Sequence, residues 1–160
     1  MNDKEIFTAL FDAARQSNSA MGSVSSALVR DGEIIDIATS SGDTGRHAED
    51  LLFEKLTERG IQILPSDVLY VTLVPCGKRT PGGKGEKYGD CTAKVLKTPI
   101  KKVIYASPDH QMKFSQERFE SAGVSLIQSD DPEITREAGQ IFVETLTDES
   151  YIQTRGSREL

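Results

Sequence analysis

Residues 68–76 read Val-Leu-Tyr-Val-Thr-Leu-Val-Pro-Cys, an almost continuous apolar run that stops at a proline. Such a run is typical of a central strand that helices cover on both faces, because neither face then needs polar side chains. Pro75 ends the run, since proline has no N–H to donate to a neighbouring strand. We therefore expect a strand at Val68–Val74 in the middle of a sheet, with Cys76 just after its carboxyl end.

The segments around this strand alternate between strand and helix patterns. Asp31-Gly32 stands between two strand-like runs and is a strong hairpin signal. The expected order is helix 4–16, strands 24–30 and 33–39, helix 47–59, strand 68–74, helix 91–97, strand 102–106, helix 114–122, strand 124–128 and helix 132–146. This order predicts an α/β fold, a three-layer α/β/α sandwich around one mixed five-stranded sheet.

The length of 160 residues suits one compact domain, and 37% hydrophobic residues suffice for its core. We expect a single domain over residues 1–147. Residues 148–160 lack a core pattern and are expected to form a C-terminal tail.

The charge balance bears on the partners of the chain. Nineteen Lys and Arg against 25 Asp and Glu give a formal net charge of −6, which disfavours nucleic acid as a dedicated partner. No apolar run approaches the roughly 18 residues of a membrane span. The start, residues 1–5, is too polar for a signal peptide. We expect a cytoplasmic protein without a membrane partner.

Three of the four Cys and His residues stand at the ends of expected elements. His47 opens a helix, Cys76 follows the central strand, and Cys91 opens the next helix. Strand carboxyl ends and helix N-termini converge on one edge of such a sheet. Three N/S ligands predict a tetrahedral zinc site with its fourth position open, which is typical of catalytic zinc. A water in that position loses its proton near neutral pH and becomes a nucleophile.

Glu49 lies two residues after His47, in the first turn of the same helix. A carboxylate there can take the proton from the attacking water and deliver it to a leaving nitrogen. Other interpretations stay open: the helix dipole also favours a first-turn Glu, and Cys76 and Cys91 are also compatible with buried free thiols or a disulfide. The catalytic hypothesis rests on the combination of all four residues.

His47-Ala48-Glu49, then Pro75-Cys76, then Cys91 resemble the signature of the zinc-dependent nucleobase deaminases. The order of phrases from His47 to Val124 is most similar to the deaminase domain of bacterial riboflavin biosynthesis, within the cytidine deaminase-like superfamily. The matching phrases are residues 71–76, Cys91, residues 100–103 and residues 121–124.

This resemblance implies a cytidine deaminase-like fold and hydrolytic removal of an exocyclic amine. The substrate is then a small aminated heterocycle, as a free base, nucleoside or nucleotide, including an aminopyrimidine of the riboflavin-pathway type. Zinc is the implied cofactor, with His47, Cys76 and Cys91 as ligands and Glu49 as the proton shuttle. The backbone at Ala48, Glu49 and Pro75 is expected to face the substrate ring, and the chain is expected to form a homo-oligomer.

The chain departs from the riboflavin family's pattern at positions that concern substrate recognition. Val74 stands where that family usually has Glu before Pro-Cys, and residues 107–110 read Ser-Pro-Asp-His where it has Asp-Pro-Asn-Pro. Residues 18–22 lack the proline of its Asn-Pro-x-Val-Gly phrase.

Residues 77–90 form a Gly- and Lys-rich segment between the two cysteines, with four basic and two acidic residues. We expect this segment to close over the site, with Lys84 and Lys87 steering a phosphate or another anion on the substrate. A solvated surface insertion is the alternative. Ser40, at the end of the second strand, is a further candidate for substrate contact, and His110 is expected to be a surface residue.

Two other functions stay open. One is an editing deaminase acting on tRNA or single-stranded DNA, which the acidic composition disfavours. The other is a non-catalytic, zinc-stabilised interaction domain, which has no need of Glu49. A thiol redox protein is disfavoured, because fourteen residues separate Cys76 from Cys91.

Overall fold

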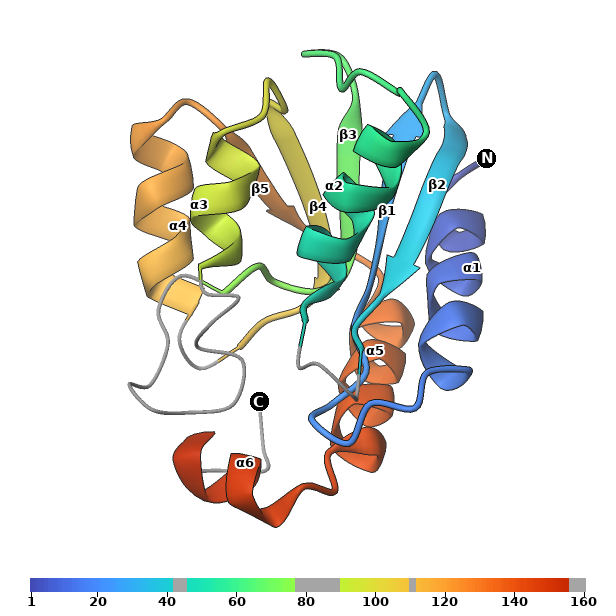
Figure 1. The fold of residues 1–160 in the computed structure, drawn as a ribbon, viewed down its shortest axis with the longest axis vertical. Coiled ribbons are helices and arrows are strands. Elements are labelled where there is room, and N and C mark those ends of the chain that lie inside the picture. The colour runs from blue at the N-terminus through green and yellow to red at the C-terminus, as the bar shows by residue number, and fades with distance from the viewer. Residues whose placement is uncertain (42–45, 77–89, 110–111, 156–160) are drawn as a thin grey trace.

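The computed structural model describes residues 1–41, 46–76, 90–109 and 112–155. A five-stranded sheet lies between two layers of helices (Figure 1). The strands are β1 Ser25–Arg30, β2 Glu33–Thr39, β3 Val68–Leu73, β4 Lys102–Ser107 and β5 Ser125–Gln128, in the spatial order β2-β1-β3-β4-β5. β1 is antiparallel to β2 and β3, whereas β3, β4 and β5 are parallel. The predicted fold class is confirmed.

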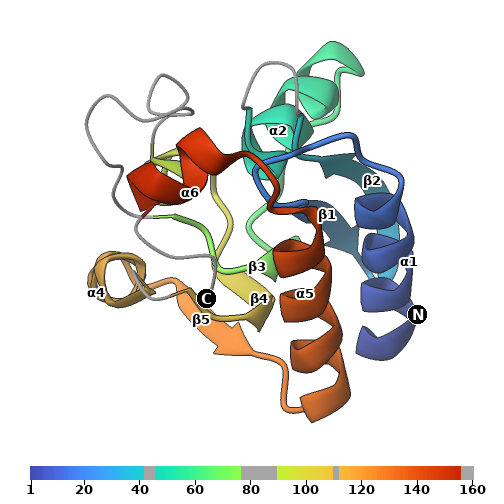
Figure 2. The same cartoon turned by 90° about the horizontal axis from the view of Figure 1, so that it is seen from below.

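Helices cover both faces of this sheet. The helices are α1 Asp3–Arg15, α2 Ala48–Glu58, α3 Cys91–Leu96, α4 Met112–Ser121, α5 Pro132–Thr145 and α6 Glu149–Arg155. One face carries α1 and α5, and the other carries α2, α3 and α4. Seen from below, α6 lies across the edge where the parallel strands end (Figure 2).

The central strand shows why two helix layers form. Leu69 and Val71 on β3 pack with the apolar side chains of α2, α3 and α4. Tyr70, between them, points to the opposite face and packs with α1 and α5. Successive side chains of a strand point to opposite faces, so a continuous apolar run must be covered on both sides. The apolar run at residues 68–74 thus matches a strand that helices cover on both faces.

The hairpin between β1 and β2 turns at Asp31-Gly32, as predicted. Both residues have positive φ, 52° for Asp31 and 78° for Gly32. A two-residue turn of this kind matches the right-handed twist of the flanking strands. β1 and β2 are thereby placed at one side of the sheet, with the parallel strands at the other.

Residues after Asp148 form the helix α6, whereas the sequence predicted no regular element in this segment. The predicted boundary of the domain at residue 147 stays a prediction. Among the described residues, no helix combines the length and apolarity that crossing a bilayer requires.

Candidate metal centre and active site

His47, Cys76 and Cys91 meet at the edge where β3 ends and α2 and α3 begin. His47 is the N-cap residue of α2, in an extended conformation, and Cys91 is the first residue of α3. The His47 Nδ1 lies 3.2 Å from the Cys91 Sγ and 3.7 Å from the Cys76 Sγ. All three donor atoms lie within 4.8 Å of one another. The structure therefore brings the three predicted ligands together.

The beginning of α3 holds the backbone of Cys76 in place. The Thr92 N–H and the Thr92 hydroxyl both donate to the Cys76 carbonyl, each at 3.0 Å. The Cys91 N–H points at the Cys76 Sγ, 3.4 Å away. Asp90 caps this helix by accepting from the Ala93 N–H at 2.9 Å. These contacts fix the two cysteines relative to each other although residues 77–90 separate them in the sequence.

The donor set fits a zinc ion. Both cysteines are free thiols, so the disulfide alternative is not realised. Two sulfur donors and one imidazole nitrogen are ligands that zinc prefers, and three protein ligands leave one position open. Contact with Cys76 and burial raise the pKa of the Cys91 thiol. A dication between the two thiols favours their thiolate forms, so metal binding here releases protons.

Glu49 lies in the first turn of α2 and is only 3% exposed. Burial raises the pKa of its carboxyl group, although His47 and Cys91 act in the opposite direction. A carboxyl group beside a reacting molecule can accept a proton and later return it. Its position on the pocket wall gives that group access to a bound molecule.

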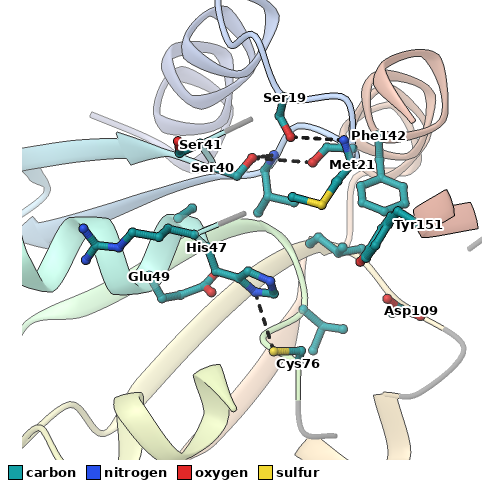
Figure 3. A pocket seen from close by; sticks show the side chains of 16 residues that line it. Ser19, Met21, Ser40, Ser41, His47, Glu49, Cys76, Asp109, Phe142 and Tyr151 are labelled. Atoms are coloured by element: carbon teal, nitrogen blue, oxygen red, sulfur yellow. Dashed lines mark hydrogen bonds between the residues drawn. The ribbon is translucent and has the colours of Figure 1, made fainter. Parts of the chain in front are cut away.

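A pocket opens directly above these residues (Figure 3). His47, Glu49 and Cys76 contribute to one side of it, and Ala48 is also among the lining residues. The rest of the lining comes from segments that the sequence does not place together: the loop before β1, the end of β2, the residues after β4, and helices α5 and α6. These residues include Ser19, Met21, Ser40, Asp109, Phe142 and Tyr151.

Ser40, a predicted candidate for substrate contact, lines the pocket, and its contact with a substrate stays a prediction. Its hydroxyl accepts from the Val24 N–H at 3.1 Å and lies 3.5 Å from the Gly22 carbonyl. Ser40 therefore shapes the pocket by tying the loop before β1 to the end of β2.

Pro75 is not among the residues that line the pocket. Its carbonyl oxygen instead accepts from the Ser115 hydroxyl at 2.5 Å, and the Thr92 hydroxyl, which donates to the Cys76 carbonyl, lies 3.4 Å away. The Pro75 backbone thus serves to anchor the turn after β3 against α3 and α4. The other predicted substrate contacts, Lys84 and Lys87, and also His110, lie outside the described residues, so their roles stay predictions.

Met21, Arg46, Asp109, Phe142 and Tyr151 line the pocket but were not predicted as site residues. Phe142 belongs to the apolar stripe of α5 and was interpreted as core. Tyr151 lies in the segment interpreted as a tail, where the aromatic residue itself and Asp148 as a candidate N-cap are the available signals. Arg46 forms ion pairs with Asp50 and Glu54 of α2. Its guanidinium group therefore also stabilises the helix that begins directly after His47.

The fold and the His/Cys/Cys group together define a zinc-binding α/β domain. The chain belongs to the family described as the cytidine and deoxycytidylate deaminase zinc-binding region, whose sequence profile matches residues 1–107. Zinc is therefore its cofactor. A search of curated proteins finds no match to the chain.

Solved structures share the fold. The diaminohydroxyphosphoribosylaminopyrimidine deaminase/5-amino-6-(5-phosphoribosylamino)uracil reductase of Thermotoga maritima matches with a TM-score of 0.71 and 22% identity, over 95% of this chain and 41% of its own. The Rib2 deaminase of Aspergillus oryzae matches with a TM-score of 0.68 and 15% identity, over 96% and 97% of the two chains. The dCMP deaminase of cyanophage S-TIM5, solved with dCMP and dUMP, matches with a TM-score of 0.59 and 17% identity, over 81% and 99%.

The chain thus spans about two fifths of the Thermotoga protein and nearly all of the Aspergillus one. At these identities the similarity establishes the cytidine deaminase-like fold. The chain thus shares its fold with riboflavin-pathway deaminases and a dCMP deaminase, and the family profile gives its family.

Proposed function

We propose that the chain is a zinc-dependent hydrolase that removes an exocyclic amine from a small aminated heterocycle, as a free base, nucleoside or nucleotide. The observation that carries this proposal is Glu49, a buried carboxyl group on the wall of a pocket that His47 and Cys76 also line. A purely structural zinc site is closed by four protein ligands and needs no such carboxylate. An open donor set beside a carboxylate is the arrangement that hydrolysis requires.

In the proposed mechanism, His47, Cys76 and Cys91 hold the metal. When bound, zinc supplies Lewis acidity that makes water a nucleophile near neutral pH. Glu49 accepts one proton from the attacking water and later donates it to the leaving nitrogen. The reaction balances as heterocycle–NH₂ plus water giving heterocycle C=O plus ammonia. Ala48, buried beside Glu49, is the proposed backbone contact to the ring.

Two comparisons support an aminated pyrimidine as the substrate. The cyanophage deaminase was solved with dCMP and dUMP, and the Thermotoga protein is named for an aminopyrimidine. We extend both to this chain as a proposal, which includes an aminopyrimidine of the riboflavin-pathway type. A homo-oligomeric state and a cytoplasmic location remain predictions.

Ammonia release from a panel of compounds tests the reaction. The panel contains cytosine, cytidine, dCMP, adenosine, guanosine and an aminopyrimidine of the riboflavin-pathway type, together with a tRNA and a single-stranded DNA oligonucleotide. We expect about one zinc per chain and ammonia from at least one small compound. Chelation of the metal should abolish release, and added zinc should restore it.

The same panel separates the proposal from its alternatives. Ammonia from the tRNA or the oligonucleotide alone would identify an editing deaminase and contradict a small-molecule substrate. Bound zinc without ammonia from any compound, aminopyrimidines of the riboflavin type included, would favour an interaction domain. A purified protein without metal would contradict the mechanism.

Lys84 and Lys87 are proposed to steer an anionic group of the substrate toward the site. Replacing both with Ala should lower kcat/KM for a nucleotide about 10-fold while changing that for its nucleoside little. The measurement is the ratio of the two kcat/KM values in wild type and variant. An unchanged ratio would mean that the segment is a surface insertion without this role.

A further inference from the structure

The pocket has two chemically different sides. His47, Glu49 and Cys76 form the polar side, whereas Met21, Phe142 and Tyr151 lie together opposite them (Figure 3). We call these three residues the aromatic wall. Phe142 is 4% exposed and forms the buried part of the aromatic wall. Met21 and Tyr151 are half-buried and form its exposed part, which faces the pocket. Two rings and a thioether make an apolar, polarisable surface.

Backbone contacts join the two segments that carry the wall. Met21 forms an isolated antiparallel bridge with Leu146 at the end of α5. The N–H groups of Thr147 and Asp148 both donate to the Ala20 carbonyl, at 2.8 and 2.9 Å. The loop before β1 and the start of α6 are thus fastened together, although more than a hundred residues separate them in the sequence.

Asp148 sets the direction in which α6 leaves this junction. Its carboxylate accepts from the Tyr151 N–H at 3.1 Å, and its carbonyl accepts from the Ile152 N–H at 2.9 Å. These are the contacts of an N-cap residue. The capped turn carries Tyr151 to the pocket.

Gly22 makes room for the ring of Phe142. A Cβ at this position would lie 2.3 Å from the Phe142 Cε2, and the φ of Gly22 is +86°. No other residue type fits both the positive φ and the close approach without displacing the ring. The junction is therefore shaped around Phe142.

We propose that the aromatic wall binds the flat face of the substrate heterocycle and selects which ring the site accepts; this inference rests on the proposed function. A planar aminated ring whose face rests on Tyr151 presents its edge, with the exocyclic amine, along the pocket toward Glu49. Every heterocyclic base has an aromatic face, so stacking supplies affinity, and the outline of the pocket around that face limits ring size.

The position of the aromatic wall in the sequence supports its proposed role in selecting the substrate ring. Phe142 and Tyr151 lie beyond residues 1–107, the part that the family profile matches. His47, Glu49, Cys76 and Cys91 all lie within it. The polar side thus comes from the shared part of the domain, and two of the three wall residues come from the rest of the chain.

Kinetics of Tyr151 variants test the wall in the reaction. Tyr151→Ala should raise KM about 10-fold for each small compound that the wild type deaminates, with kcat changed less than about 3-fold. Tyr151→Phe should leave both constants near their wild-type values. Gln153→Ala, an exposed position on the same helix, is the matched control. A KM unchanged in Tyr151→Ala would overturn the proposal.

A binding measurement tests the wall without catalysis. The chain has no tryptophan, so Tyr151→Trp introduces a single one at the wall while keeping an aromatic face. In the Glu49→Gln background, we expect saturable quenching of its fluorescence by cytidine, dCMP, adenosine or guanosine. Introducing the tryptophan at Gln153 instead should give no saturable quenching.

The two proposals fail in distinguishable ways. Ammonia release by the wild type without quenching by the compounds it deaminates would overturn the wall and leave the deaminase intact. Saturable quenching without ammonia from any compound would support heterocycle binding by the wall and overturn the deaminase. Gly22→Ala, which moves Phe142, should raise KM in the same direction as Tyr151→Ala with zinc content unchanged. An unchanged KM in that variant would contradict a role for Phe142.

Discussion

Glu49 and Asp67 are two buried carboxyl groups with opposite surroundings. Burial dominates for Glu49 and raises its pKa. Burial also acts on Asp67, but hydrogen bonds from Arg30 and from the Leu64 N–H outweigh it, so the pKa of Asp67 lies below its ordinary value. The Arg30 guanidinium group donates to both carboxylate oxygens of Asp67, at 2.8 and 2.9 Å, and the Leu64 N–H donates a third hydrogen bond at 2.7 Å. The proposed proton shuttle Glu49 and the ion-paired Asp67 thus have pKa values shifted in opposite directions.

The ion pair of Asp67 should make the protein sensitive to acid. Because the folded pKa is below the unfolded value of about 3.9, the stabilisation is present above roughly pH 4 and is lost as the pH falls through the folded pKa. Asp67→Asn should cost about 2 kcal/mol at pH 7. Urea unfolding at pH 7 and pH 3 should show a smaller loss of stability in Asp67→Asn than in the wild type. Equal losses would contradict this role.

Single residues at the metal centre were predictable because each stands at the end of an element. His47 caps α2, Cys76 follows β3 and Cys91 begins α3. Topology alone brings such positions to one edge of the sheet. The role of Pro75 was not predictable in this way, because it depends on hydroxyls of α3 and α4 that reach its carbonyl.

At the scale of elements, α2 protects the outer edge of β2. Lys55 donates to the Ile37 carbonyl at 2.5 Å, and Arg59 donates to the Ile35 carbonyl at 3.2 Å. Both cations also contact Asp36 on the strand, at 3.0 and 2.7 Å. An edge strand with open backbone groups is a template for pairing with another chain, and charged side chains discourage that pairing.

Removing these cations should expose the edge. Lys55→Ala with Arg59→Ala is expected to increase self-association, because the carbonyls of β2 lose their donors while the strand stays in place. Light scattering over a range of protein concentrations measures the effect. Lys97→Ala with Lys101→Ala, two exposed lysines elsewhere, removes the same charge and should change little. Equal behaviour of the two double variants would contradict the protective role.

The elements with clear local patterns were predictable, and α6 was not. The hairpin, β3 and α5 carry an Asp-Gly turn, a continuous apolar run and an Asp-Pro start, respectively. The helix α6 has seven residues, and backbone hydrogen bonds to the Ala20 carbonyl fasten the chain just before it. Backbone groups are the same for every residue type, so such contacts leave almost no pattern in the sequence. Asp148 as an N-cap was the available signal.

At the scale of the whole molecule, the site combines one edge of the central sheet with the short helix α6. The carboxyl ends of β2, β3 and β4 all reach the edge that carries the metal centre, and α6 lies across that edge. Among the described residues, the two core clusters contain no residue of α6, since their last members in sequence are Ile141 and Leu126. Folding and substrate recognition should therefore be separable.

Removing residues 148–160 tests that separation and the predicted domain boundary. The shortened chain should fold and keep its zinc, because neither core cluster loses a residue. Its KM should rise about 10-fold through loss of Tyr151. Circular dichroism, metal analysis and ammonia kinetics give the three readings. An unfolded product would place α6 within the folding domain, and an unchanged KM would remove Tyr151 from the site.

The most direct test of the catalytic account is the rate of ammonia release by Glu49→Gln at measured zinc content. Glu58→Gln is the matched control, because it makes the same chemical change at an exposed position on the same helix. We predict that both variants keep about one zinc per chain. Glu49→Gln should lose activity by about 100-fold or more, while Glu58→Gln keeps the wild-type rate. A zinc-loaded Glu49→Gln that releases ammonia as fast as the wild type would contradict the assignment of Glu49 as the proton shuttle.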